Sequence, residues 1–192
     1  MSDPTSFGRF DHLKRFYSIL DKLAKESGGP KLLSQCTGRM SWPTRGVYFF
    51  QEQGEVRTDT GAGPRIVRVG THALNAGSQT SLWGRLSQHR GQAKSGSGNH
   101  RGSIFRLLVG TALVDVHGCA ISTWGQGSHA PRTVREKEQP LEMLVSKSIG
   151  AMPFLWLAVT DAPGPDSLRG YIERNAIALL SNYCRPVLDA PS

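Results

Sequence analysis

Apolar residues recur with a helical period in five segments of the chain. Spacings of three and four residues bring such side chains onto one face of a helix, and that face packs against a core. The first segment stops at Gly28-Gly29-Pro30, and Asp166 or Ser167 can cap the last one. The expected helices cover residues 9–27, 80–90, 103–113, 141–149 and 167–182.

Three shorter segments, rich in β-branched and aromatic residues, predict strands over 45–50, 65–70 and 154–159. A turn-rich segment separates the first two, which can pair as a long hairpin. Strict alternation in the second strand would place Ile66 and the stem of Arg68 on one face of the sheet and the valines on the other. The third strand is continuously apolar and is expected to be buried on both faces.

Together these elements predict an α+β fold, with a small three-stranded sheet, antiparallel or mixed, that helices flank. Their order from the first strand onward is strand–strand–helix–helix–helix–strand–helix. Residues 1–43 would form an N-terminal helical extension, 44–185 the main domain and 186–192 a tail. Within the main domain, residues from about 91 to 138 are interpreted as an insertion.

The composition favours a polyanionic partner. The 192 residues suffice for one domain with a substantial core, and their formal net charge of +8 attracts nucleic acid first and anionic membrane second. The longest apolar run is too short to span a bilayer, and the first residues do not resemble a signal peptide. The cysteines, Cys36, Cys119 and Cys184, are isolated, which argues against a zinc knuckle or a disulfide framework and for a reducing cytoplasm.

A glycine- and serine-rich loop, GQAKSGSGNHRG, covers residues 91–102 and also carries Lys94, His100 and Arg101. A basic loop of this kind before a helix can bind phosphate through its backbone N–H groups. It lacks the Gly-Lys-Ser/Thr sequence of a P-loop. Both a phosphate-binding loop and a flexible solvated loop fit this pattern.

Two basic residues, Arg85 and His89, lie four positions apart on one expected helix and therefore share a face. That face borders the apolar stripe of Leu82 and Leu86, so the pair would lie at a seam between elements. Arginine is a permanent bidentate donor and histidine can carry a proton, so together they could hold a phosphate group. The alternative is a surface helix whose basic residues extend into solvent.

Glu173 falls among the apolar positions of the last expected helix. Viewed down the helix axis, it projects between Ile177, four residues on, and Leu180, seven residues on. It would be partly desolvated there, and an unpartnered carboxylate would destabilise the fold or take up a proton. Glu173 therefore needs either a basic side chain or a bound cation as its partner.

Taken together, these segments resemble the GIY-YIG nuclease family over residues 45–182. The residues that carry the resemblance are Gly46-Val47-Tyr48 and Arg68-Val69-Gly70 on the two hairpin strands, and Arg85, His89 and Glu173 on two helices. In the family's terms, Arg85 is similar to the invariant arginine, His89 to a histidine that some members carry, and Glu173 to the metal-binding glutamate.

Two positions depart from the family pattern. Arg68 stands where the second signature has a tyrosine, as in some restriction-type members, so the route of proton transfer stays open. The asparagine that often follows the glutamate has two candidates, Asn175 and Asn182. Both project nearly opposite to Glu173 on an ideal helix.

The resemblance implies hydrolysis of phosphodiester bonds with one divalent ion, Mg²⁺ or Mn²⁺, bound by Glu173. Arg85 would hold the phosphate, and Tyr48 would lie next to the attacking water. A phenol has a pKa of about 10, so cations such as Arg68, Arg85 or His89 would have to lower it. His89 could instead accept the proton. The expected catalytic residues are Tyr48, Arg68, Arg85, His89 and Glu173.

The expected function is a metal-dependent endonuclease for double-stranded DNA, of restriction or defence type. A nuclease for RNA or branched DNA and a non-catalytic nucleic-acid-binding domain are the alternatives. Sequence recognition would need further surface from the insertion, the N-terminal helix, a homodimer or a separate specificity domain beyond Ser192. The expected nucleic-acid contacts are Lys94, His100, Arg101, Arg132 and Arg135.

Overall fold

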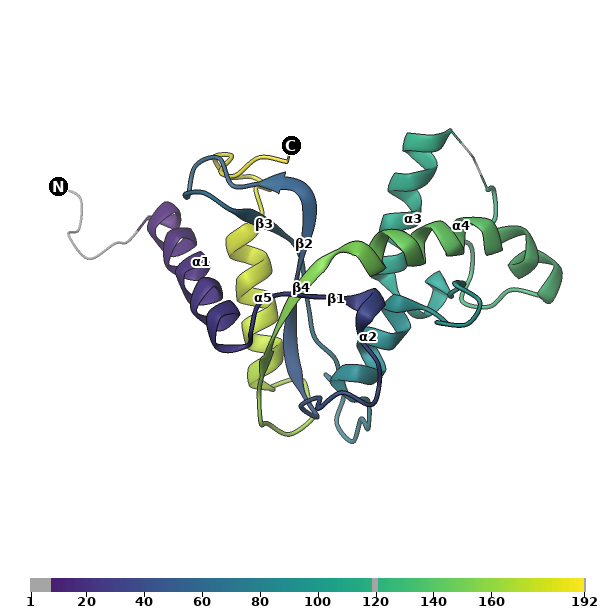
Figure 1. Cartoon of the computed structure of the whole chain (residues 1–192), viewed down its shortest axis with the longest axis horizontal. Helices are drawn as coiled ribbons and strands as arrows, with labels where there is room; N and C mark the ends of the chain where they lie inside the picture. The colour runs from purple at the N-terminus through teal and green to yellow at the C-terminus, as the bar shows by residue number, and fades with distance from the viewer. Residues whose placement is uncertain (1–7, 119–120, 192) are drawn as a thin grey trace. The chain divides into compact units, whose positions relative to one another are not determined.

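A computed structural model describes residues 8–118 and 121–191 of the chain (Figure 1). Cys119, Ser192 and the first seven residues of the expected N-terminal extension lie outside the described residues. The chain divides into two compact units. The sheet unit comprises the described residues of 1–31, 43–82 and 153–192, and the helical unit those of 32–42 and 83–152.

The sheet has four strands, β1 (Lys31–Leu32), β2 (Gly46–Val56), β3 (Pro64–Gly70) and β4 (Pro153–Ala158). They are hydrogen-bonded in the order β1-β4-β2-β3, and β2 runs antiparallel to both of its neighbours. The expected α+β fold is confirmed. The sheet differs in one detail, because the two-residue β1 adds a fourth strand to the three expected.

Two helices, α1 (Arg9–Glu26) and α5 (Leu168–Leu180), pack on one face of the sheet and lie side by side (Figure 1). Both follow the predicted segments closely, and the hydroxyl of Ser167 caps α5 by accepting the N–H of Gly170. Their apolar stripes form the core with the sheet, as expected. The core residues are Leu13, Tyr17, Leu20, Val47, Phe49, Ile66, Val69, Val159 and Ala176.

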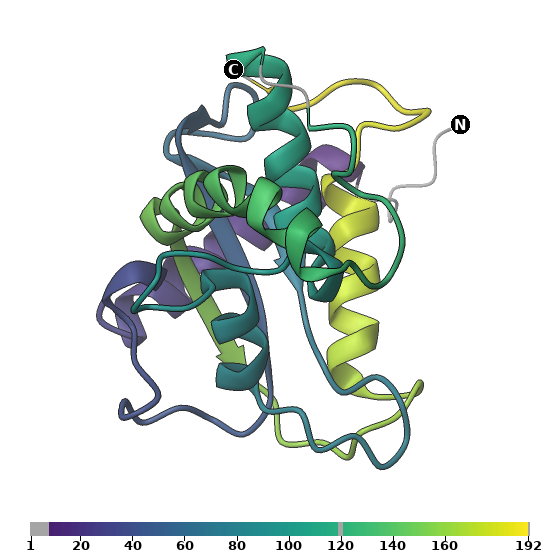
Figure 2. The same cartoon turned by 90° about the vertical axis from the view of Figure 1, so that its right-hand side faces the viewer.

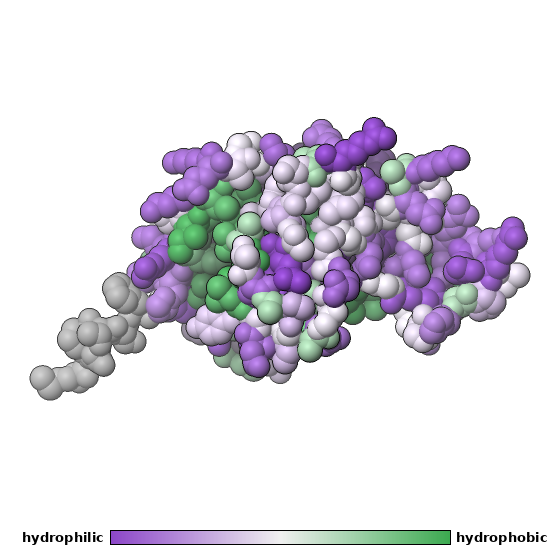
Figure 3. All heavy atoms as spheres, turned by 90° about the horizontal axis from the view of Figure 1, so that it is seen from below, coloured by the Kyte–Doolittle hydropathy of each residue, from purple (hydrophilic) through white to green (hydrophobic). Residues whose placement is uncertain are grey.

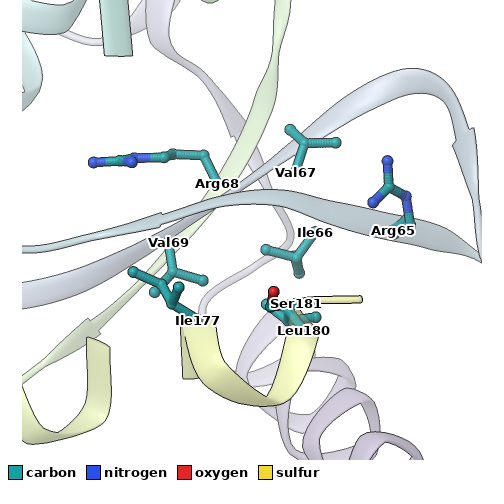
Figure 4. Close-up of a pocket in the computed structure, with 8 residues that line it drawn as sticks. All are labelled: Arg65, Ile66, Val67, Arg68, Val69, Ile177, Leu180 and Ser181. Carbon is teal, nitrogen blue, oxygen red and sulfur yellow. The ribbon is translucent and has the colours of Figure 1, made fainter. Parts of the chain in front are cut away.

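Strict alternation fails in β3. Ile66 and Val69 both point toward α5, whereas Val67 and Arg68 both point away from it (Figure 4). The register with β2 skips Val67, which lies between the paired residues Ile66 and Arg68. An extra residue of this kind is a β-bulge, and it shifts the following side chains by one position. The prediction that Ile66 and Arg68 share a face was therefore wrong.

The strand β4 is also less buried than its sequence predicted. Phe154 and Leu155 are buried, but Trp156 and Leu157 are half-buried and Ala158 is exposed. A continuous apolar run thus marks a strand that is fully buried only at its second and third residues. The expectation of burial on both faces along its whole length was wrong.

Three helices organise the helical unit: α2 (Leu82–Arg90), which begins at the last residue of a sheet-unit segment, α3 (Ile104–His117) and α4 (Arg132–Ala151). Figure 2 shows α3 and α4 crossing each other. Gly91 ends α2 with a φ of +78°, and the hydroxyl of Ser103 caps α3, which agrees with the expected helices over 80–90 and 103–113. None of the described helices is long and apolar enough to cross a membrane.

The α4 helix corrects another expectation. The sequence predicted irregular chain up to Gln139 and a short helix over 141–149. A proline inside a helix normally breaks it. The observed helix begins at Arg132 and passes through Pro140. Two buried glutamates, Glu138 and Glu142, lie one turn apart on either side of the proline and form ion pairs inside the unit. These pairs anchor the helix both before and after Pro140.

The last described residues are held against the sheet unit. Asp189 is buried, and its carboxylate accepts the backbone N–H groups of Thr58, Asp59 and Thr60 at 2.8 to 3.0 Å, together with the hydroxyl of Thr60. Burial alone would raise the pKa of Asp189, but these hydrogen bonds outweigh it and hold the pKa below its ordinary value. The segment expected as a tail therefore fastens the loop between β2 and β3.

Candidate active site

Tyr48 lies in the middle of the sheet and is fully buried. It pairs in register with Gly70 on β3, and its ring contacts Phe50 edge-on with 5.7 Å between the ring centroids. A Cβ atom at residue 70 would overlap the Tyr48 ring and its hydroxyl oxygen. Gly70 is therefore the residue that allows the tyrosine to lie where it does.

Arg68 lies on the same strand as Gly70, two residues earlier. It is half-buried and pairs in register with Phe50, two residues after Tyr48. Registered neighbours in an antiparallel pair project to the same face of a sheet. Arg68 and Tyr48 are thus on the face opposite to α5, and Figure 4 shows the arginine pointing away from that helix.

Glu173 on α5 is half-buried, and its Oε1 accepts the backbone N–H of Thr71 at 3.1 Å. Thr71 follows Gly70 directly, and its hydroxyl donates to the carbonyl oxygen of Gly46 at 2.8 Å. Thr71 thereby joins the carboxylate to the end of β3 and to the start of β2. Thr71 was not among the residues expected at the site, although it directly follows the second signature.

The donor chemistry of Glu173 suits a hard divalent cation. Mg²⁺ is commonly held by one or two carboxylates and keeps several of its water molecules. Among the described residues, no three His, Cys, Asp or Glu side chains gather into a site made entirely of protein ligands. Glu173 is therefore the carboxylate at this strand end that could hold a hydrated divalent ion.

Arg169, which is fully buried, organises the chain around α5. It forms an ion pair with Asp161 and donates to the carbonyl oxygens of His72, Ala73 and Ala162. Burial would raise the pKa of Asp161, but the hydrogen bonds and charge of Arg169 lower it on balance. Arg169 thus fixes the segment after Thr71, and its partners His72 and Ala73 lie 97 and 96 positions earlier in the sequence, too far for a local pattern to predict.

In the helical unit, Arg85 is partly exposed on α2. Its Nη1 donates to Oε1 of Gln88 at 3.0 Å and to the carbonyl oxygen of Gly102 at 3.1 Å. Two neutral acceptors orient this guanidinium without neutralising its charge. Arg85 therefore remains a cation that can bind an anion.

His89 lies one turn after Arg85 but is fully buried. Its Nδ1 is 2.7 Å from the hydroxyl oxygen of Ser103, and its ring contacts Phe105 edge-on. The carbonyl oxygen of His89 accepts Nη1 of Arg106 at 2.8 Å. The structure thus places His89 in the packing that joins α2 to the start of α3.

Two of the expected nucleic-acid contacts have partners inside the helical unit. His100 is buried, with Nδ1 2.9 Å from Oε1 of Glu142 and Nε2 accepting the N–H of Gly125 at 3.2 Å. Arg101 pairs through both terminal nitrogens with Glu138, a pairing that lowers the pKa of the glutamate. Both side chains therefore form contacts inside the helical unit, whereas the sequence predicted that they contact nucleic acid.

The three other expected contacts, Lys94, Arg132 and Arg135, are exposed. Lys94 stands on the glycine-rich loop, and the two arginines lie in the first turn of α4. Arg132 pairs with Glu136 at 2.6 Å, but the arginine side chain is 86% exposed. These residues remain available to a polyanion.

Comparison with known families identifies the domain. A family model described as the GIY-YIG domain matches residues 7–192, which is nearly the whole chain. No match to a curated protein or to a solved structure was found. The chain therefore belongs to the GIY-YIG domain family, whose members are nucleases that act on nucleic acid.

Proposed function

We propose that this chain is a divalent-metal-dependent endonuclease that hydrolyses phosphodiester bonds in double-stranded DNA. The observation that carries the proposal is the link from Tyr48 to Glu173. Gly70 accommodates the tyrosine ring, and the next residue, Thr71, binds the Glu173 carboxylate. A phenol and an oriented carboxylate are thereby fixed to the same end of β3.

Glu173 would hold one Mg²⁺ or Mn²⁺ ion, which when bound would neutralise charge on the phosphate and lower the barrier to attack by water. The hydrogen bond from Thr71 keeps Oε1 in place before the metal arrives. Such preorganisation is valuable because the ligand does not have to reorganise during the reaction.

Tyr48 would act beside the attacking water. A tyrosine is a poor base near neutral pH unless nearby positive charge favours the phenolate. Arg68, on the same face of the sheet, is the candidate for that charge within the sheet unit. It stands where the family's second signature has a tyrosine, and it would replace that residue with a permanent cation.

Arg85 would bind the phosphate as negative charge develops on it. Its two acceptors, the side chain of Gln88 and the carbonyl of Gly102, leave the charge intact, and a guanidinium binds phosphate oxygens in pairs. For His89, burial and the contact with Ser103 support a role in holding α2 in place rather than proton transfer.

The test is cleavage of a supercoiled plasmid with Mg²⁺, Mn²⁺ or EDTA. We expect metal-dependent cleavage that falls by at least about 100-fold in Glu173→Gln and in Arg85→Ala, as for loss of a major electrostatic contribution. Binding of DNA should survive both changes. Discrete bands would support the restriction or defence type of activity. Near-normal rates in both variants would contradict the site assignment.

Hairpin, flap and RNA substrates complete the same experiment. Metal-dependent cleavage of these substrates without cleavage of the plasmid would redirect the proposal to a structure-specific or RNA-directed nuclease. Salt-sensitive binding without cleavage of any substrate would indicate a non-catalytic nucleic-acid-binding domain.

A further inference from the structure

Most of the excess positive charge of the chain belongs to the helical unit. Its residues include ten Lys or Arg and four Asp or Glu, a formal +6 of the chain's +8. The sheet unit is longer but carries only the remaining +2. Figure 3 shows hydrophilic side chains over much of the visible face on the side of α3 and α4.

The acidic residues of this unit are largely engaged with its own arginines. Glu138 pairs with Arg101 and Glu142 with Arg106, and both glutamates are buried. Each pair removes one positive and one negative charge, so the remaining charged side chains, eight Lys or Arg and two Asp or Glu, still carry the formal +6. The exposed basic residues of the unit are Arg39, Lys94, Arg132, Arg135, Lys137 and Lys147.

The glycine-rich loop in this unit is built around Arg106, which is fully buried. The guanidinium donates to the carbonyl oxygens of His89 and Glu142, to the Glu142 carboxylate and to the hydroxyl of Ser146. A Cβ atom at Gly98 would overlap the guanidinium. The loop backbone thus packs directly onto Arg106, so its shape is set before any ligand binds.

Two hollows flank Gly98, which lines both of them. The first, of about 500 Å³, is lined by polar residues and glycines without a charged group: Ser87, Gln88, Gly91, Gln92, Gly98, Asn99 and Gly102. The second, of about 250 Å³, contains Arg132, Arg135 and Gln139, together with Glu136. An amide-lined hollow and a guanidinium-lined hollow therefore adjoin the same glycine.

We infer that these two hollows form one DNA-reading surface, in which Arg132 and Arg135 bind backbone phosphates and the amides of Gln88 and Gln92 contact base edges. Glutamine amides offer a paired donor and acceptor that match adenine in the major groove, whereas arginine contacts to phosphate carry no sequence information. This inference rests on the proposed function, because it names the part of the chain that selects the substrate.

Gln88 also connects the proposed DNA-reading surface to the proposed cleavage site. Its Oε1 accepts Nη1 of Arg85, the residue proposed to bind the scissile phosphate. A base that engaged the Gln88 amide would therefore act on the orientation of Arg85. Oε1 of Gln92 instead accepts the hydroxyl of Ser95 on the same loop at 2.9 Å, so Gln92 is the better residue for testing base recognition alone.

The test measures binding of duplex DNA by the full chain, with Ca²⁺ in place of Mg²⁺, at several salt concentrations. We expect Arg132→Ala and Arg135→Ala each to weaken binding on every sequence and to reduce the salt slope by about 1. Lys22→Ala is the matched control, since Lys22 is an exposed cation on α1 of the sheet unit. It should change both quantities by less than either arginine variant.

Gln92→Ala should keep the salt slope but reduce discrimination among duplexes that differ at one base pair by roughly 5- to 100-fold, the range for loss of a bidentate base contact. Selection from a randomised duplex library supplies the preferred sequence of the wild type. Arginine variants that match Lys22→Ala, or a Gln92→Ala variant with unchanged preference, would overturn the inference.

Failure of the inference is separable from failure of the proposed function. If the wild type cleaves DNA and these variants bind DNA normally, the proposed nuclease activity is supported and the proposed DNA-reading surface is contradicted. If the wild type binds DNA through the two arginines but never cleaves it, the DNA-reading surface is supported and the nuclease activity is contradicted. A wild type that binds no DNA would overturn both.

Discussion

The ring of Tyr48 occupies the space that a side chain at Gly70 would need. We therefore expect Gly70→Ala to destabilise the fold by about 1 to 3 kcal/mol, as overpacked core substitutions do. The cleavage rate should fall as well, because the displaced ring is the proposed neighbour of the attacking water. Urea unfolding and plasmid cleavage measure the two effects.

Gly102→Ala is the control for that substitution, since a Cβ atom at Gly102 would contact nothing within 4 Å. Its stability should stay within about 0.5 kcal/mol of the wild type. Equal stability of Gly70→Ala and wild type would show that the tyrosine does not depend on this close approach.

Thr71 binds Glu173 through its backbone and Gly46 through its hydroxyl. Thr71→Val removes only the hydroxyl, so we expect a loss of about 1 to 3 kcal/mol from the unpaired carbonyl of Gly46. Cleavage should stay within several-fold of the wild type, because the N–H that orients the carboxylate remains. Thr71→Ser should restore stability, and a valine variant without activity would instead assign the hydroxyl to the reaction.

Asp189 should make stability depend on pH at the acidic end. Its pKa in the folded chain lies below the ordinary 3.8, so its contribution is present above that value. The contribution is lost as the pH falls through the lower folded pKa. We expect Asp189→Asn to lower the urea midpoint at pH 7, and the difference from the wild type to shrink below about pH 4. A constant difference across that range would refute a role for the ionised carboxylate.

The buried pair of Arg106 and Glu142 should be sensitive to removal of one partner. Glu142→Gln leaves a buried guanidinium without its counter-ion, which typically costs about 3 to 5 kcal/mol. Glu136→Gln on the same helix removes an exposed pair and should cost less than about 1 kcal/mol. Thermal unfolding compares the two, and equal losses would show that burial of the pair does not decide its importance.

Most of the fold could be predicted from the local pattern of apolar and polar residues. The apolar period predicted α1 and α5, and the expected helices over 80–90 and 103–113 match the end of α2 and the start of α3, because each depends on neighbours in sequence. The order of the signature residues indicated the family, which the match over residues 7–192 confirms.

Long-range partners explain where prediction failed. A proline such as Pro140 normally breaks a helix, but the ion pairs of Glu138 and Glu142 hold the helix on both sides of it. The bulge at Val67 depends on the register with β2, and the tail residue Asp189 depends on a loop about 130 positions earlier. For the candidate site, the sequence singled out Tyr48 and Glu173 but not the threonine that connects them to the same strand end.

The sheet unit is assembled from three separate stretches of chain, and Gly46 of β2 pairs with Ala158 of β4. Closing a loop of more than about a hundred residues carries an entropic penalty that grows with the logarithm of loop length. The contacts within 83–152 are more local, so we expect them to form early and to shorten the effective loop. In kinetic terms the helical unit then acts as an internal folding aid, and substitutions at Arg106 should slow the pairing of β2 with β4 although neither strand contains that residue.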